Sequence, residues 1–240
     1  MRKTVIALVA LGLVVASSAF AANAVRISQV YGGGGSSPGT YKYDYVELFN
    51  SSSAPVNIGG WSLQYGSSTG SSFGRSTYNY VFIPDGSVIP ACGYFLSRGY
   101  CGSAGADLPI VADLVTTNVA PPGAFNCSGT SGKFALFNDQ VTNRTPAQVM
   151  AVPTPSFVVD LVGYGPSANA YETSPAPVLD NNSVLVRGMG GLTDNDNNST
   201  DFTKIALPYA MHNSGSALNP DCQIVPAMSE TWGRVKTLYR

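Results

Sequence analysis

The residues with the clearest metal-binding chemistry lie in GGLTDNDNNSTDF, residues 190–202. Within eight residues, Asp194, Asp196, Asn198 and Asp201 offer the carboxylate and amide oxygens that Ca²⁺ prefers. The stretch departs from the EF-hand pattern, because no glycine stands at the sixth position and no helical pattern flanks it. Aspartate and asparagine also favour turns through local hydrogen bonds. The sequence therefore leaves two interpretations open, a calcium loop and a solvated turn.

A second stretch, GSSTG at residues 66–70, matches the G-x-S-x-G pattern of a hydrolase nucleophile around Ser68. That motif works on a strand-to-helix turn, with a histidine and an acid from elsewhere in the chain. No helical pattern follows residue 70, and His212 is the one histidine. We therefore expect no catalytic residues and no enzyme. A hydrolase that uses a metal held by the acidic loop is the catalytic alternative, and its turnover would disappear in an Asp196→Ala variant.

Four consecutive glycines, Gly32–Gly35, raise the question of a phosphate-binding loop. A dinucleotide fingerprint needs a helix directly after its glycines, because the helix N-terminus holds the pyrophosphate. Here the next regular element is YDYVELF (43–49), which alternates like a strand. The glycines are therefore interpreted as a connection between two strands, with no cofactor.

Alternation of apolar and polar residues predicts the elements that position these groups. In YDYVELF, Val46 and Leu48 face one way while Tyr45, Glu47 and Phe49 face the other. Further strands are predicted in WSLQY (61–65), NYVFI (79–83), GYFLS (93–97), KFALF (133–137), FVVDLVGYG (157–165), SVLVR (183–187) and FTKIAL (202–207). Many short strands separated by turn residues indicate an all-β antiparallel sandwich or barrel.

The N-terminus reads as a signal peptide over residues 1–21: Arg2 and Lys3 precede an apolar run, and a small-x-small cleavage site follows. We therefore expect export, with a domain at 22–218 and a tail at 219–240 that contains a short amphipathic helix. No other stretch has the roughly 20 apolar residues of a transmembrane helix. The 13 basic and 14 acidic residues leave no basic stripe, which argues against nucleic acid as a partner.

Four cysteines in an exported chain predict disulfide bonds. If GYFLS pairs antiparallel with KFALF, extension of that register brings Cys101 near Cys127. Cys92 would then pair with Cys222 and attach the tail to the domain. The other two connectivities stay open at this point.

The motifs ISQVYGGGG, YDYVELFN, VNIGGWSLQY, IPACGYFL, SGKFALFN, VVDLVGYG and TDNDNNSTDFT occur in an order that resembles the bacterial secreted lamin-tail domains. The resemblance covers roughly residues 25–215. It implies an immunoglobulin-like β-sandwich, enlarged by insertions around 98–130 and 138–155, in a family of binding or targeting modules without catalytic residues.

Charged positions inside the predicted strands, Asp44, Glu47 and Asp160, are expected on a solvated face or a sheet edge. Five tyrosines expected to be exposed have two possible roles, contact area for recognition or filling of an edge strand. These are Tyr41, Tyr43, Tyr78, Tyr80 and Tyr100. The leading hypothesis is thus a non-catalytic module that binds an extracellular or cell-surface protein. The alternative is a structural envelope protein anchored through its C-terminal tail.

Overall fold

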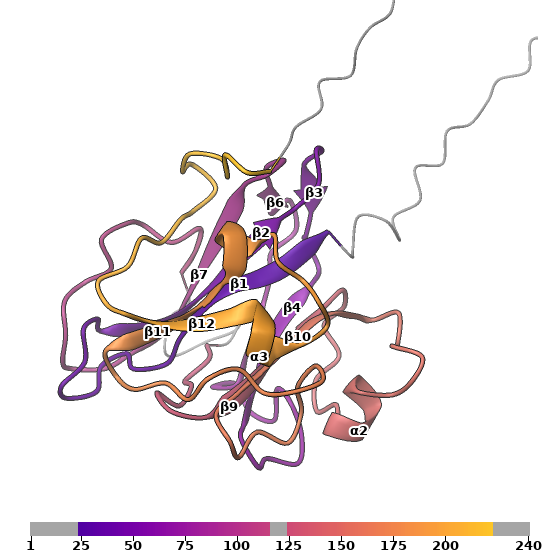
Figure 1. Ribbon diagram of the computed structural model, residues 1–240, viewed down its shortest axis with the longest axis horizontal. Coiled ribbons are helices and arrows are strands. Elements are labelled where there is room, and N and C mark those ends of the chain that lie inside the picture. Colours follow the sequence, from indigo (N-terminus) through magenta and orange to yellow (C-terminus); the bar gives the residue numbers. More distant parts are fainter. Residues whose placement is uncertain (1–23, 116–123, 223–240) are drawn as a thin grey trace, which may run out of the picture.

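The protein is described by a computed structural model over residues 24–115 and 124–222, and it is a sandwich of two sheets (Figure 1). The larger sheet has the strand order β12-β11-β1-β2-β7-β8, and its pairs are antiparallel except for β7 with β8. Its strands are β1 (Val25–Tyr31), β2 (Tyr43–Asn50), β7 (Tyr94–Cys101), β8 (Leu114–Val115), β11 (Ser183–Arg187) and β12 (Phe202–Ala206). The predicted signal peptide and tail helix lie outside the described residues.

The smaller sheet has four antiparallel strands in the order β10-β9-β4-β5. They are β4 (Ser62–Ser67), β5 (Tyr80–Phe82), β9 (Gly132–Phe137) and β10 (Val158–Tyr164). Two short strands, β3 (Val56–Asn57) and β6 (Val88–Ile89), pair separately. Each strand predicted from alternation is present, and the predicted β-sandwich is confirmed.

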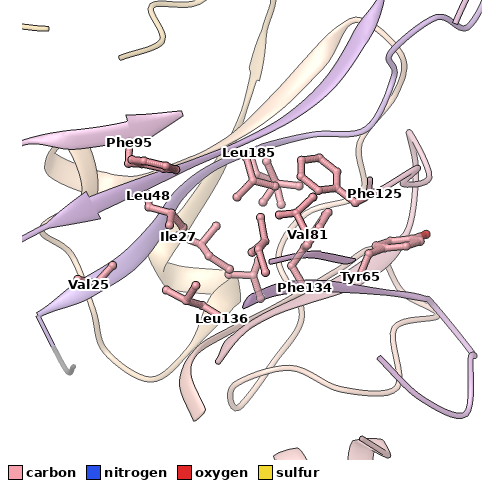
Figure 2. Close-up of a cluster of buried hydrophobic side chains, with 14 of the residues drawn as sticks. Val25, Ile27, Leu48, Tyr65, Val81, Phe95, Phe125, Phe134, Leu136 and Leu185 are labelled. Carbon is pink, nitrogen blue, oxygen red and sulfur yellow. The ribbon is translucent and has the colours of Figure 1, made fainter. Parts of the chain in front are cut away.

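The core between the sheets is built from the inward faces of both (Figure 2). From the larger sheet come residues such as Ile27, Leu48 and Leu185, and from the smaller sheet Phe134 and Leu136. Alternation in β2 holds as predicted, because Val46 and Leu48 belong to this core while Tyr45 and Phe49 pack on the opposite face. Burial on this scale is the main favourable term in the stability of such a domain.

Insertions cover both outer faces of the sandwich. On the larger sheet, Tyr31, Tyr45 and Val186 pack under residues from 108–112 and 205–211. Tyr41, which was expected to be exposed, is buried there with 6% of its surface accessible. On the smaller sheet, the covering residues include Val149 of α2 (Pro146–Val149), a short helix with a capping box at Thr145.

A bulge in β10 changes which residues face the core. The register shifts between Val158 and Asp160, so Val159 and Val162 point to the inter-sheet core and Leu161 packs on the outer face. Strict alternation along FVVDLVGYG would place Leu161 on the same inward face as Val159, and this interpretation is wrong, because an extra residue in a strand breaks the alternation.

One of the two predicted disulfide bonds is present. Cys92 and Cys222 are bonded, with their Cα atoms 5.5 Å apart. Cys101 and Cys127 are free thiols, so the 101–127 prediction is wrong. The assumed pairing of GYFLS with KFALF fails, because β7 lies in the larger sheet and β9 in the smaller.

The four glycines are packed tightly at one end of the sandwich. A Cβ on Gly33 would lie 2.6 Å from backbone atoms of Asn181, and one on Gly34 would lie 2.1 Å from the backbone nitrogen of Asp44. A Cβ on Gly32 would meet the Ser128 carbonyl oxygen at 2.3 Å. The run is thus the strand-to-strand connection that was predicted, and it consists of glycine because neighbouring backbones approach too closely for any side chain.

Candidate functional site

The site contains a buried arginine, Arg187, at the end of β11. Its Nη2 donates to both carboxylate oxygens of Asp160 on β10, at 3.1 and 2.9 Å. Its guanidinium carbon lies 4.5 Å from the centre of the Phe202 ring. Hydrogen bonds between a charged donor and a charged acceptor are stronger than those between neutral groups. This pair connects the two sheets through the core.

The same pair completes the hydrogen bonding of a bulge in β1. The β1–β2 register shifts between Ile27 and Gln29, and the pairing of β1 with β11 includes Gln29 and Val30 only. The N–H of Ile27 donates to Asp160 at 2.6 Å, and its carbonyl oxygen accepts from Arg187 Nε at 2.8 Å. Because buried backbone groups need partners, these two side chains take the place of a missing strand.

The acidic loop folds around the arginine. Asp194 lies 2.8 Å from Arg26 Nε and 3.5 Å from Arg187 Nη1, and Asp201 lies 3.7 Å from Arg187 Nη1. Asp201 also accepts from the Asn195 backbone and side chain, at 2.9 and 2.6 Å. Burial acts to raise the pKa of Asp201, but these hydrogen bonds and the charge of Arg187 hold it below its ordinary value.

Asn198 belongs to the short helix α3 (Asn198–Asp201) and satisfies the open edge of β10. Its Oδ1 accepts from the Gly163 N–H at 2.9 Å, and its Nδ2 donates to the Leu161 carbonyl oxygen at 2.9 Å. One side-chain amide thus supplies the acceptor and the donor that a neighbouring strand would offer. A strand edge covered in this way is protected from pairing with other chains.

The structure brings together two of the four predicted calcium ligands. Asp194 and Asp201 meet Glu172, and one carboxylate oxygen from each of the three lies within 4.8 Å of the others. Asp196 is exposed and Asn198 is engaged by β10, so these two do not join them. If a divalent cation binds, Glu172, Asp194 and Asp201 are the residues to hold it. Calcium binding stays a prediction.

Glu172 was missed from the sequence because it lies in a loop, YETSP, far from the acidic stretch. Its Oε2 accepts from Asn198 Nδ2 at 2.8 Å. Burial, followed by the neighbouring charge of Asp160, raises the pKa of Glu172 to about 9. The site therefore holds a neutral carboxylic acid at neutral pH. This is how four carboxyl groups are accommodated beside two arginines.

The charged strand residues Asp44, Glu47 and Asp160 were predicted on a solvated face or a sheet edge; none of the three is on a solvated face, and only Asp160 lies on an edge strand, β10. Each has 5% or less of its surface accessible. Asp44 accepts from the Gly34 and Cys127 N–H groups, both at 2.8 Å. The prediction fails because insertions cover the outer faces and because loops converge at the end of the sandwich.

The single histidine pairs with Glu47 on the outer face of the larger sheet. The His212 N–H and Nδ1 lie 2.7 and 3.1 Å from the same Glu47 oxygen, and the imidazole stacks on Tyr94 with ring centres 4.3 Å apart. Ser68 belongs to a turn after β4, in the smaller sheet. Ser68 and His212, the serine and the histidine that a G-x-S-x-G hydrolase would have to bring together, therefore lie on different sheets.

A buried lysine organises the Ser68 turn. Lys133 Nζ donates to the carbonyl oxygens of Ser67 and Gly70 at 2.6 and 2.9 Å, and to Asn169 Oδ1 at 2.7 Å. Burial lowers the pKa of Lys133 to about 8. The turn is thus fixed from within by an ammonium group and is not the strand-to-helix elbow that acyl transfer requires.

Comparison with known families decides what kind of domain carries this site. Residues 18–143, more than half of the chain, match the lamin tail domain family. The chain belongs to the lamin-tail domain family. The match ends between β9 and α2, so the lamin-tail profile includes the first nine strands, while the Arg187 site is built largely from strands beyond it.

One solved structure resembles this lamin-tail chain in fold. It is a DUF4876 family protein from Bacteroides thetaiotaomicron, which superposes with a TM-score of 0.51 at 10% sequence identity over 83% of this chain and 75% of its own. No curated protein matches the sequence. Within the described residues, no helix is long and apolar enough to cross a membrane.

Proposed function

We propose that this chain is an exported, non-catalytic lamin-tail module that acts through protein interaction or attachment at the cell surface. The observation that carries the proposal is its membership of the lamin-tail family. The signal-peptide pattern supports export. The Cys92–Cys222 disulfide supports it as well, because disulfide bonds form and persist in oxidising compartments outside the cytoplasm.

The buried polar groups support a module without chemistry of its own. Arg187 and Asp160 hold the two sheets together, Asn198 covers a strand edge, and Lys133 fixes a turn. Each is engaged by groups of the fold itself, which is what a structural role requires. The partner contacts would then lie in the loops that this rigid sandwich presents.

Attachment is proposed to use the C-terminal tail. The tail sequence SETWGRVKTLYR (229–240) places Trp232, Val235 and Leu238 on one side of a helical pattern, with basic residues on the other. Such a segment suits recognition by export or anchoring machinery. On the alternative, the whole protein is a structural envelope component held by the same tail.

The test is fractionation of producing cells that express the full-length chain or a chain ending at Met228. A matched control carries residues 229–240 in scrambled order, which keeps length and charge. If only the full-length protein stays with the cells, the sequence of the tail is recognised as an anchoring signal. Equal release of all three forms into the medium removes the anchoring role and leaves soluble partners of the loops.

The metal-dependent hydrolase has its own discriminating experiment. Hydrolytic turnover that needs a divalent cation, disappears on Asp194→Ala and persists in Asp196→Ala would replace the present proposal. Cation binding without turnover would assign the acidic loop a structural role.

A further inference from the structure

Three loops meet at one end of the sandwich, and a buried carboxylate joins two of them. Asp44 has 1% of its surface accessible. One of its oxygens accepts from Gly34 in the glycine connection, and the other accepts from Cys127 in the loop before β9, each at 2.8 Å. The third loop, around Asn181, touches the other two, because a Cβ on Gly33 or Gly129 would collide with it. We call this contact of residues 32–35, 127–129 and 181 the loop junction.

The groups that face Asp44 in the described part of the chain include no cation. The Cys127 thiol lies within hydrogen-bonding reach of the Asp44 carboxylate. The hydroxyl groups of Tyr31, Tyr65 and Tyr164 interact electrostatically with the same carboxylate. Burial raises the pKa of each of these four groups above its ordinary value. Between pH 5 and 8, therefore, Asp44 is the member of this cluster whose charge changes.

We propose that Asp44 is a proton-dependent latch, which holds the loop junction closed in acidic medium and lets it open more readily as the pH rises to neutrality. A closed junction places the ionised carboxylate in a site with two N–H donors and, among residues 24–115 and 124–222, no counter-charge. An open junction returns it to water, where the charged form is well solvated. Opening is therefore coupled to release of a proton.

The direction and the size of the pH effect on junction opening follow from the linkage between proton binding and opening. Burial raises the pKa of Asp44 in the closed junction to about 7, from an ordinary value of 3.8. Between these two values the open state binds fewer protons than the closed state, so the opening constant rises about tenfold per pH unit. Above about pH 8 both states are ionised, and the opening constant becomes independent of pH.

Amide hydrogen exchange tests the latch in the full chain. After correction for the intrinsic pH dependence of exchange, opening of segments 32–42 and 124–131 should increase about 50-fold from pH 5 to pH 7 and level off at about 100-fold above pH 8. Segment 145–150, whose helix α2 has no acidic residue in its first turn, serves as the internal control.

Two variants complete the test. Asp44→Asn keeps one acceptor oxygen but cannot ionise, so exchange at its junction should not depend on pH. Asp113→Asn removes an exposed carboxylate that also accepts backbone N–H groups, and it should leave the pH dependence intact. Wild-type exchange that is flat across the range, or equal pH dependence in Asp44→Asn, overturns the proposal.

If Asp44→Asn does not fold, the carboxyl ¹³C resonance of Asp44 in the wild-type protein decides the question. A titration midpoint near neutrality supports the latch. A midpoint near the ordinary value of about 4 overturns it.

Discussion

Replacement of Glu172 by glutamine should stabilise the protein, and by an amount that depends on pH. In the folded state the carboxyl of Glu172 has its pKa raised to about 9 by burial and by Asp160, against an ordinary value of 4.5. Glutamine reproduces the neutral acid and keeps an amide oxygen to accept from Asn198. The variant therefore removes a titrating group without removing its main contact.

The expected gain follows from the difference between the two pKa values. Below pH 4.5 the side chain is protonated in both the folded and the unfolded state, and the full stability is present. As the pH rises towards 9, the unfolded state alone releases its proton, so the free energy of unfolding falls by about 1.4 kcal/mol per unit. At pH 7 the loss amounts to about 3 kcal/mol, an upper value because solvent reaches part of the side chain.

Thermal unfolding of both proteins from pH 5 to pH 8 measures this difference. At pH 7 the melting temperature of Glu172→Gln should exceed that of the wild type by about 6–12 °C, and at pH 5 the gap should shrink to about a quarter of that value. Asp180→Asn is the control of opposite sign, because a hydrogen bond from Lys204 lowers the pKa of Asp180. Equal melting temperatures across the range for Glu172→Gln and wild type would refute this account of the site.

Three further outcomes are expected. Gly33→Ala should lower the free energy of unfolding by more than about 2 kcal/mol, because its Cβ would meet backbone atoms 2.6 Å away, while Gly215→Ala, with its nearest neighbour at 3.5 Å, should stay within about 0.5 kcal/mol of wild type. Cys92→Ser should cost about 4 kcal/mol in denaturant unfolding, because the disulfide closes a loop with a sequence separation of 130. In a calcium titration by calorimetry, Asp194→Asn should weaken any binding and Asp196→Asn should not, whereas weakening by both variants would favour the ligand set expected from sequence.

The strands could be predicted from the sequence because alternation is a local property. Val46, Leu48 and Tyr45 take the faces that the pattern assigns to them. Leu161 does not, because a bulge is invisible in a pattern that assumes one residue per step. The Cys92–Cys222 bond could be proposed, but the 101–127 pair depended on which strands are neighbours, a long-range property that alternation does not contain.

The site was predicted less well than the fold. The acidic loop could be located from its composition, but the cation that it surrounds is Arg187, which sequence gave no reason to place near it. Asp160 and Asp44 were expected on a solvated face or at a sheet edge, because a charged residue in a strand is usually exposed, and yet both are buried. Their burial follows from contacts between segments more than 80 residues apart, such as Asp44 with Cys127.

The disulfide between Cys92 and Cys222 also determines how the domain would respond to a pulling force. Cys222 is covalently joined to the turn before β7, so tension on the chain beyond it passes directly to that turn. After β12, the chain that covers the larger sheet runs back towards β6 and β7 (Figure 1). Because the disulfide carries the tension, this covering segment is not pulled away from the sheet. Residues 93–221 are enclosed in the covalent loop and cannot lengthen the tether even if they unfold. Until the bond is reduced, a domain held by its C-terminus could thus lengthen under load only through the chain outside this covalent loop.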